Sequence, residues 1–281
     1  MSAALPPAPA SPAAIAERAR ELRRDVVTMI HRAGDGHPGA ALSAADIVAT
    51  LYFGVLRVDP SHPGWPDRDR FVLSKGHACP VLYAALARRG YFDPALLPTL
   101  RTLGSPLQGH PDMRKTPGVD MTTGSLGHGI SLGAGMAAAG RLQGRSFEVF
   151  VVTGDGELNE GLAWEGTVSA ARLGLDHLHV FVDNNGWQSD GRVEDVSGMT
   201  GIARRFETFG WHVQEIDGHD PAAILAAVEA DRAAPGRPHA VVARTVKGKG
   251  VPFMEGDNSW HKRVPTSAEL VEALKALGGP S

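Results

Sequence analysis

The segment Phe147-Glu-Val-Phe-Val-Val-Thr153 is rich in β-branched and aromatic residues and runs directly into Gly154-Asp-Gly156. This composition predicts a buried strand that ends in a tight turn. A second segment of the same kind, Leu178-His-Val-Phe-Val-Asp183, ends in the pair Asn184-Asn185. Between the two, residues 162–173 have the apolar period of a helix. A strand, a helix and a strand in this order predict a βαβ unit with parallel strands.

The same alternation extends along the chain. Further strands are predicted at residues 70–74, 212–217 and 240–246, and further helices at residues 11–30, 44–53, 79–89, 221–231 and 266–277. We expect Ser43 to be the N-cap of the second helix, after a loop at residues 31–39. The pattern predicts an α/β fold in three layers, α/β/α, with a mostly parallel sheet. We expect a flexible Ala/Pro-rich tail over residues 1–10 and a single domain over residues 11–281.

Composition restricts the possible partners and compartments. The 281 residues carry 28 basic and 31 acidic side chains, and a net charge of −3 disfavours binding to nucleic acid. At 43% hydrophobic residues the chain can form a core, which excludes general disorder. The one cysteine, Cys79, cannot form an intramolecular disulfide, and the most apolar stretch, residues 40–56, is interrupted by Ser43 and Asp46. We therefore expect a cytoplasmic protein with no membrane partner.

Polar residues follow the two central strands at the point where each strand ends. Carboxyl ends of parallel strands meet at one edge of a sheet, where ligands bind. Asp155 and Asn185 supply oxygen ligands of the kind Mg²⁺ prefers, and Gly156 allows a phosphate to approach the backbone. The pattern predicts a metal-bridged diphosphate site, with simple tight turns as the alternative. A P-loop is excluded because no Gly-Lys-Ser or Gly-Lys-Thr sequence occurs.

Histidines gather in loops rich in glycine and proline. His37, His77 and His110 each lie in such a loop, and His261 follows Trp260. Histidine near pH 7 can donate a hydrogen bond to a phosphate or an alkoxide. Their spacing does not match a zinc site. The segment Thr122-Thr-Gly-Ser-Leu-Gly-His-Gly129 leads into a helix of small residues, which permits close packing of a cofactor ring or of a neighbouring element.

Six motifs occur in an order that is typical of one family. They are GHPGAALSAADIVATLYF (residues 36–53), DRFVLSKGHA (69–78), QGHPD (108–112), TTGSLGHG (122–129), GDGELNEG (154–161) and VDNNG (182–186). With these motifs the chain resembles transketolase, a thiamine diphosphate enzyme, from about residue 14 to about residue 270. It looks like the N-terminal, thiamine diphosphate-binding half, of the kind encoded as a separate subunit.

The resemblance implies a role for each candidate residue. It implies a Mg²⁺ ion, or Ca²⁺ or Mn²⁺ in its place, held by the side chains of Asp155 and Asn185 and the backbone carbonyl of Trp187. Residues expected to contact thiamine diphosphate are His77, Gly124, Leu126, Asp155, Gly156, Glu160, Asn185 and His261. Residues expected to act in catalysis are His37, His77, His110 and His261. Glu160 is expected at a subunit contact, supported by Glu165, and the role of His128 stays open.

The resemblance also implies a partner. In the family, the glutamate that activates the cofactor and the arginines that bind the sugar phosphate lie in a following pyrimidine-binding domain. We therefore expect the partner to be a C-terminal subunit, in an α₂β₂ heterotetramer. The expected reaction transfers a two-carbon ketol unit from a ketose phosphate to an aldose phosphate. The alternatives are a subunit of another thiamine diphosphate-dependent ligase or dehydrogenase, and a non-catalytic regulatory relative.

Overall fold

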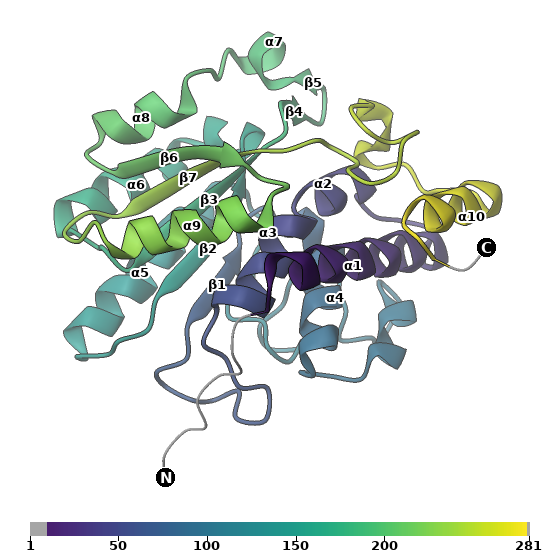
Figure 1. Ribbon diagram of the computed structural model, residues 1–281, viewed down its shortest axis with the longest axis horizontal. Coiled ribbons are helices and arrows are strands. Elements are labelled where there is room, and N and C mark those ends of the chain that lie inside the picture. The colour runs from purple at the N-terminus through teal and green to yellow at the C-terminus, as the bar shows by residue number, and fades with distance from the viewer. Residues whose placement is uncertain (1–9, 280–281) are drawn as a thin grey trace.

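The centre of the molecule is a parallel five-stranded sheet in the order β1-β2-β3-β7-β6 (Figure 1). The computed structural model describes residues 10–279, so the predicted tail lies, apart from Ala10, outside the described residues. The strands of the sheet are β1 (Arg70–Leu73), β2 (Val149–Gly154), β3 (Leu178–Asn184), β6 (His212–Asp217) and β7 (His239–Arg244). All four strand pairings are parallel, which confirms the predicted α/β fold and its parallel sheet.

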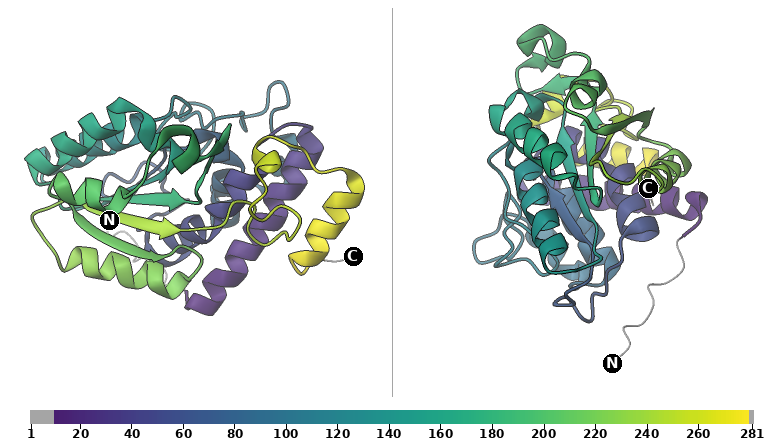
Figure 2. Two further views of the ribbon diagram at one scale, coloured as in Figure 1. Left: turned by 90° about the horizontal axis from the view of Figure 1, so that it is seen from above. Right: turned by 90° about the vertical axis from the view of Figure 1, so that its left-hand side faces the viewer.

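Helices cover both faces of the sheet, which gives the predicted three layers (Figure 2). One face is covered mainly by α1 (Pro12–Ala33), α3 (Ala45–Thr50), α4 (Cys79–Arg89) and α9 (Pro221–Arg232). The other is covered by α5 (His128–Leu142), α6 (Gly161–Leu173) and α8 (Ile202–Thr208). The remaining helices are α2 (Pro38–Ser43), α7 (Val193–Ser197) and α10 (Ser267–Ala276), with short helical segments η1 (Leu51–Val55), η2 (Gly76–Ala78), η3 (Pro94–Thr99), η4 (Gly156–Asn159) and η5 (Asn258–His261).

Successive side chains of each strand pack alternately into two hydrophobic cores, one on each face of the sheet. Phe150 and Val152 of β2 pack into the core beneath α1, α3 and α9. Val149 and Val151 of the same strand pack into the core beneath α5 and α6. Every residue of β2 is buried. Burial on both faces explains why this strand reads as a continuous apolar run rather than as an alternating one.

The region around Ser43 differs from the prediction. The first helix continues to Ala33, and Pro38 starts α2 inside the predicted loop, because proline suits the first turn of a helix. Ser43 is the last residue of α2 and not an N-cap. Its buried hydroxyl instead donates to Asp183 Oδ2 at 2.6 Å, so a tertiary bond takes the place of the cap.

The carboxyl ends of β1, β2, β3 and β7 lie at the same edge of the sheet. The loops that follow them carry most of the candidate residues. A small antiparallel hairpin, β4 (Trp187–Gln188) and β5 (Gly191–Arg192), follows β3 and was not predicted. Within residues 10–279, no helix is both long and apolar enough to cross a membrane.

Candidate functional site

A cavity of about 490 Å³ opens at the carboxyl ends of the strands. Its walls come from segments that are far apart in the sequence. The structure brings together around it every residue predicted for catalysis, cofactor or metal: His37, His77, His110, Gly124, Leu126, Asp155, Gly156, Glu160, Asn185, Trp187 and His261. The loops after the strands meet at this edge, as expected for an open parallel sheet.

Asp155 is buried at the end of β2, on the wall of this cavity. Its Oδ1 accepts a hydrogen bond from the backbone N–H of Gly156 at 2.8 Å, and its Oδ2 from Gly186 at 2.5 Å. No lysine, arginine or histidine nitrogen of residues 10–279 lies within 4.0 Å of the carboxylate. Burial raises the pKa of Asp155 to about 6, and the nearby Asp183 raises it as well. A cation bound here would relieve both effects.

Asn185 lies in the turn after β3, next to Asp155. The same turn supplies the Gly186 N–H that binds Asp155. The amide oxygen of Asn185 accepts from the backbone N–H of Trp187 at 3.0 Å, and its nitrogen donates to Ser43 at 3.3 Å. The turn therefore holds an amide oxygen and a carboxylate at one corner of the cavity, an oxygen-rich donor set suited to Mg²⁺.

Three of the four candidate histidines form a cluster on another wall. The ring centroid of His37 lies 5.2 Å from that of His77 and 5.3 Å from that of His261. Burial lowers the pKa of His37 and of His261 to about 4, and it holds the pKa of His77 well below its ordinary value. Burial also lowers the pKa of His110. Near pH 7 these rings are neutral, so each can donate one hydrogen bond and accept one.

His37 Nδ1 is buried and has no hydrogen-bond partner in the described part of the chain. Since buried polar atoms are nearly always hydrogen-bonded, we expect this nitrogen to form a hydrogen bond with a bound ligand.

Glycines bring backbone close to backbone around the cavity. A Cβ at Gly76 would lie 2.8 Å from Thr123 Oγ1 and 2.9 Å from the nitrogen of Gly124. A Cβ at Gly156 would lie 2.8 Å from the Cβ of Gln188. These separations are shorter than side-chain atoms tolerate, so glycine is required for the loops to meet.

Sequence reasoning missed two lysines of the cavity. Lys75 and Lys247 line it, and each is only 2% exposed. Burial lowers the pKa of Lys247 to about 8. Its Nζ donates to Asn258 at 2.6 Å and lies 3.1 Å from His261 Nδ1. The sequence feature that could have identified Lys247 is its position in the loop after a predicted strand, because ligand contacts concentrate in such loops.

Glu157 is a further missed residue, and it joins three loops below the cavity. Its carboxylate accepts hydrogen bonds from Thr153 Oγ1 at 2.7 Å, from Gly127 N at 2.8 Å and from Ser74 Oγ. The side chain is 4% exposed. Glu157 therefore fixes the glycine-rich loop before α5 against the ends of β1 and β2.

Two residues of the sequence analysis lie away from the cavity wall. Glu165 is exposed on α6, one turn after its start. His128 is exposed at the first residue of α5, with Nδ1 3.2 Å from the Leu126 carbonyl oxygen. Glu160, in contrast, lies at the cavity rim and is exposed.

A larger cavity, of about 640 Å³, lies among Tyr52, Arg57 and Arg232. Arg57 pairs with Asp69 at 2.8 Å, and Arg232 pairs with Glu148 at 2.6 Å. Arg89 also lines this cavity, and its buried Nε makes no hydrogen bond within residues 10–279. The cavity at the carboxyl ends is the better candidate site because the residues predicted for cofactor, metal and catalysis line it.

The model of the transketolase thiamine diphosphate-binding domain matches residues 13–280. The chain belongs to the transketolase family. It is 44% identical over 260 residues to the 6-deoxy-6-sulfo-D-fructose transketolase subunit SqwG of Clostridium sp. (strain MSTE9), covering 92% of this chain and 94% of the relative. It is 39% identical to an apulose-4-phosphate transketolase subunit of Actinobacillus succinogenes, covering 93% and 95%. These full-length matches identify an N-terminal transketolase subunit, part of a transferase.

Solved transketolases share the fold. A transketolase of Pichia stipitis superposes with a TM-score of 0.90 at 31% identity, covering 95% of this chain and 41% of that one. The transketolase of Leishmania mexicana gives a TM-score of 0.88 at 32% identity, covering 96% and 42%. The chain therefore spans about two fifths of the length of these transketolases.

Proposed function

We propose that this transketolase subunit works with a C-terminal subunit that carries the pyrimidine-binding domain. In that complex, an α₂β₂ heterotetramer in the cytoplasm, it transfers a two-carbon ketol unit from a ketose to an aldose. One observation carries the proposal. The residues expected to bind the metal, the diphosphate and the sugar all line one cavity, although they are spread along the sequence from position 37 to position 261.

Asp155 and Asn185 hold the Mg²⁺ ion in this proposal, with the backbone carbonyl of Trp187, and Ca²⁺ or Mn²⁺ can substitute. The support is the buried Asp155 carboxylate, which has no cationic group within 4.0 Å in the described chain. A divalent ion held by these residues would supply the missing positive charge beside the diphosphate. Gly156 leaves room for the diphosphate beside this ion.

His77 and His261 contact the diphosphate, and Gly124 and Leu126 line the space for the rings of the cofactor. Buried Lys247, 3.1 Å from His261, adds positive charge on the same side of the cavity. Bound thiamine diphosphate supplies the nucleophilic carbon and the electron sink needed to break the carbon–carbon bond.

His37, His77, His110 and His261 bind and orient the sugar and move its protons. Their pKa values are lowered, so the rings are neutral near pH 7 and can accept a proton from a sugar hydroxyl. The unpartnered Nδ1 of His37 is such an acceptor. Glu160, exposed at the cavity rim, contacts the second subunit, and Glu165 supports it.

The proposed donor is a ketose with an anionic group at the end remote from its carbonyl. Two relatives are named for such sugars, 6-deoxy-6-sulfo-D-fructose and apulose 4-phosphate. A phosphate and a sulfonate share this anionic chemistry. A donor panel of both sugars and xylulose 5-phosphate distinguishes specialised sugar catabolism from the pentose phosphate reactions.

The test is reconstitution. The chain is mixed with the pyrimidine-binding subunit that co-purifies from its native source, in the presence of thiamine diphosphate and Mg²⁺. We expect ketol transfer from the mixture and none from either chain by itself. Full activity of the isolated chain would contradict the proposal, and so would a mixture that remains monomeric in sedimentation.

The metal assignment is tested by calorimetry of the same mixture. Asp155→Asn is expected to weaken Mg²⁺-dependent binding of thiamine diphosphate at least about tenfold. Asp195→Asn removes an exposed acid of α7 and serves as the matched control. Equal binding by both variants would remove Asp155 from the site.

A further inference from the structure

Three histidines that the cavity does not use lie side by side at the opposite edge of the sheet. His179 of β3 is paired in register with His239 of β7, which is paired with His212 of β6. Residues in register on neighbouring parallel strands point to the same face. The rings of His179 and His239 are stacked at 5.1 Å, and those of His239 and His212 meet edge to face at 5.5 Å. We refer to these three residues as the histidine row.

Asp231, on the last turn of α9, lies against this row and is fully buried. Its Oδ1 is 3.2 Å from His212 Nδ1 and 3.4 Å from His239 Nδ1. Its Oδ2 is 3.2 Å from His179 Nδ1. The contacts with His212 and His179 are hydrogen bonds, and Oδ1 also accepts a hydrogen bond from Gln214 Nε2 at 2.7 Å. The helix covering the sheet therefore presents one carboxylate to all three rings.

His239 is the member whose surroundings are incomplete. Its Nε2 lies 3.0 Å from the carbonyl oxygen of Asp176, which can only accept, so Nε2 carries the ring proton. The neutral ring then has a bare lone pair on Nδ1, which faces the Asp231 carboxylate oxygen. Nδ1 is buried and makes no hydrogen bond within residues 10–279. Two facing lone pairs repel each other unless a cation lies between them.

The spacing of these atoms suits a metal ion. Ligands about 2.0–2.1 Å from a tetrahedral zinc ion lie about 3.3 Å from one another. The two distances from Asp231 Oδ1, 3.2 and 3.4 Å, match this edge length. The three ligand atoms also lie within 4.8 Å of one another. Imidazole and carboxylate together form a donor set that zinc accepts.

We propose that His212, His239 and Asp231 form a zinc site that is separate from the catalytic cavity. The ion is held by Nδ1 of each histidine and by Oδ1 of the aspartate. His212, whose side chain is 31% exposed, provides the route from solvent, and water takes the fourth position. The ion ties β6, β7 and α9 together.

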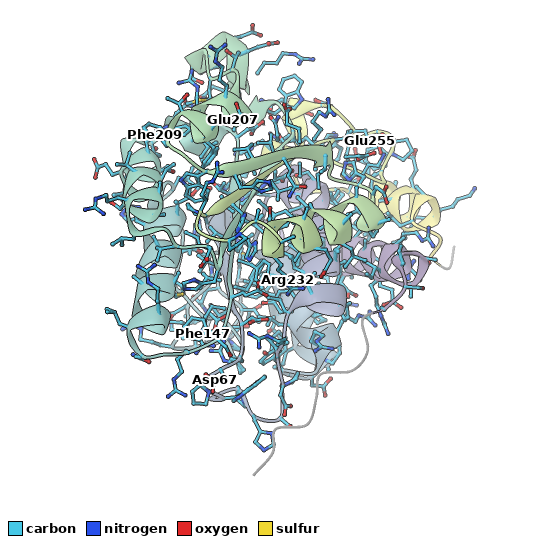
Figure 3. All side chains as sticks on the ribbon, turned by 60° about the vertical axis from the view of Figure 1, so that its left-hand side comes forward. Asp67, Phe147, Glu207, Phe209, Arg232 and Glu255 are labelled. Atoms are coloured by element: carbon cyan, nitrogen blue, oxygen red, sulfur yellow. The ribbon has the colours of Figure 1, made fainter. Side chains whose placement is uncertain are left out.

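The surroundings of these ligands match those of a metal site. Ligating histidines usually donate their second nitrogen to a carbonyl, as His239 does to Asp176. Ligating carboxylates are usually hydrogen-bonded on the other oxygen, as Asp231 is to His179. The second nitrogen of His179 reaches Glu148 at 3.2 Å, and Glu148 pairs with Arg232. Arg232, at the end of α9, is labelled in Figure 3. These surrounding residues hold the proposed ligands in place by hydrogen bonds and ion pairs, so no second metal ion is needed to orient them.

The experiment uses the full chain, stripped of metal by a chelator and titrated with Zn²⁺ in a calorimeter without thiamine diphosphate. Because His37, His77 and His261 lie near one another in the cavity, the reference is the His261→Ala variant, which excludes any contribution of that cluster to zinc binding. We expect one equivalent of Zn²⁺ to bind to this reference. We expect at least tenfold weaker binding after His212→Asn is added to it.

His212 is chosen because it is only half-buried, so its replacement should leave the fold intact, which circular dichroism checks. Co²⁺ gives a second readout: the reference should develop the visible absorption of a tetrahedral ion, and the double variant should not. Zn²⁺ should also raise the unfolding temperature of the reference alone. No zinc binding to the reference, or equal binding in both variants, would show a hydrogen-bonded network only and overturn the proposal.

Discussion

Lys75 Nζ lies 2.5 Å from Asp183 Oδ2, and both side chains are almost completely buried, with Lys75 on the wall of the candidate cavity. Asp183 also accepts hydrogen bonds from Ser43 and Thr245. One carboxylate thus joins α2, the loop after β1, the end of β3 and the loop after β7. The loop that it holds carries His77, so this ion pair positions a catalytic candidate.

Replacing Lys75 by methionine should be strongly destabilising. The Asp183 carboxylate would lose its only cationic contact within the described chain, and removing one member of a buried pair costs about 3–5 kcal/mol. The matched control is Lys249→Met, since Lys249 is 36% exposed and 3.7 Å from Glu255. The control substitution should lower the free energy of unfolding by less than about 1 kcal/mol. Denaturant unfolding measures both, and equal losses would contradict the assigned role of Asp183.

Two glycines of α5 should respond to alanine in opposite directions. A Cβ at Gly133 would lie 2.5 Å from Val151 Cγ2, so Gly133→Ala should destabilise by about 1–3 kcal/mol through overpacking. Gly135 is exposed, and a Cβ added to it would meet no neighbouring side chain, so Gly135→Ala should stabilise the helix by about 0.5–1 kcal/mol. The unfolding temperatures of the two variants test this contrast. Loss of stability in both would mean that α5 packs differently.

Acid should destabilise the cofactor-free chain through its cavity histidines. Burial lowers the pKa of His37 from 6.5 to about 4 in the folded state, so the unfolded chain binds protons first as the pH falls. The stability contributed by the neutral ring is complete above pH 6.5. It is lost progressively as the pH falls from 6.5 to about 4. His37→Gln should therefore flatten this part of the stability curve.

The control for this pH dependence is His62→Gln, because the His62 side chain is 73% exposed. Its curve should follow that of the wild type. Denaturant unfolding at a series of pH values supplies the data. An unchanged slope in His37→Gln would show that other groups determine the acid sensitivity.

Cys79 should resist alkylation in the folded chain. The thiol is buried and donates to the carbonyl of Gly109 at 3.2 Å, and burial raises its pKa to about 12. Since the thiolate is the reactive form, iodoacetamide should react at least about a hundredfold more slowly than in denaturant. The single cysteine makes mass spectrometry a clean readout. Equal rates would mean that the loop around Gly109 opens readily.

Much of the fold was predictable because the strands carry strong local signals. The β-branched run of residues 147–153 identified β2, although the strand starts at Val149. The cavity residues were predictable because they follow strand ends and form ordered motifs. The β4–β5 hairpin was not, since its strands have two residues each and no periodicity. Lys247 was missed, and Ser43 was wrongly predicted to be an N-cap, because the residues that they contact are distant in the sequence.

The histidine row was beyond prediction for a related reason. His179, His212 and His239 have no spacing that suggests a shared site. Only the strand order β3-β7-β6 makes them neighbours, and this order reverses the sequence of the last two strands. A single sequence does not determine which edge of a sheet receives a late strand.

The connections made by Asp183 also have a consequence for folding kinetics. Its partners Ser43, Lys75 and Thr245 are 140, 108 and 62 positions away along the chain. Contacts of such separation close large loops and form slowly. The helices should therefore appear early in refolding, whereas the candidate cavity can assemble only after β1, β3 and β7 have docked. Competence to bind a ligand should return in the slowest refolding phase, after most of the helical signal has recovered.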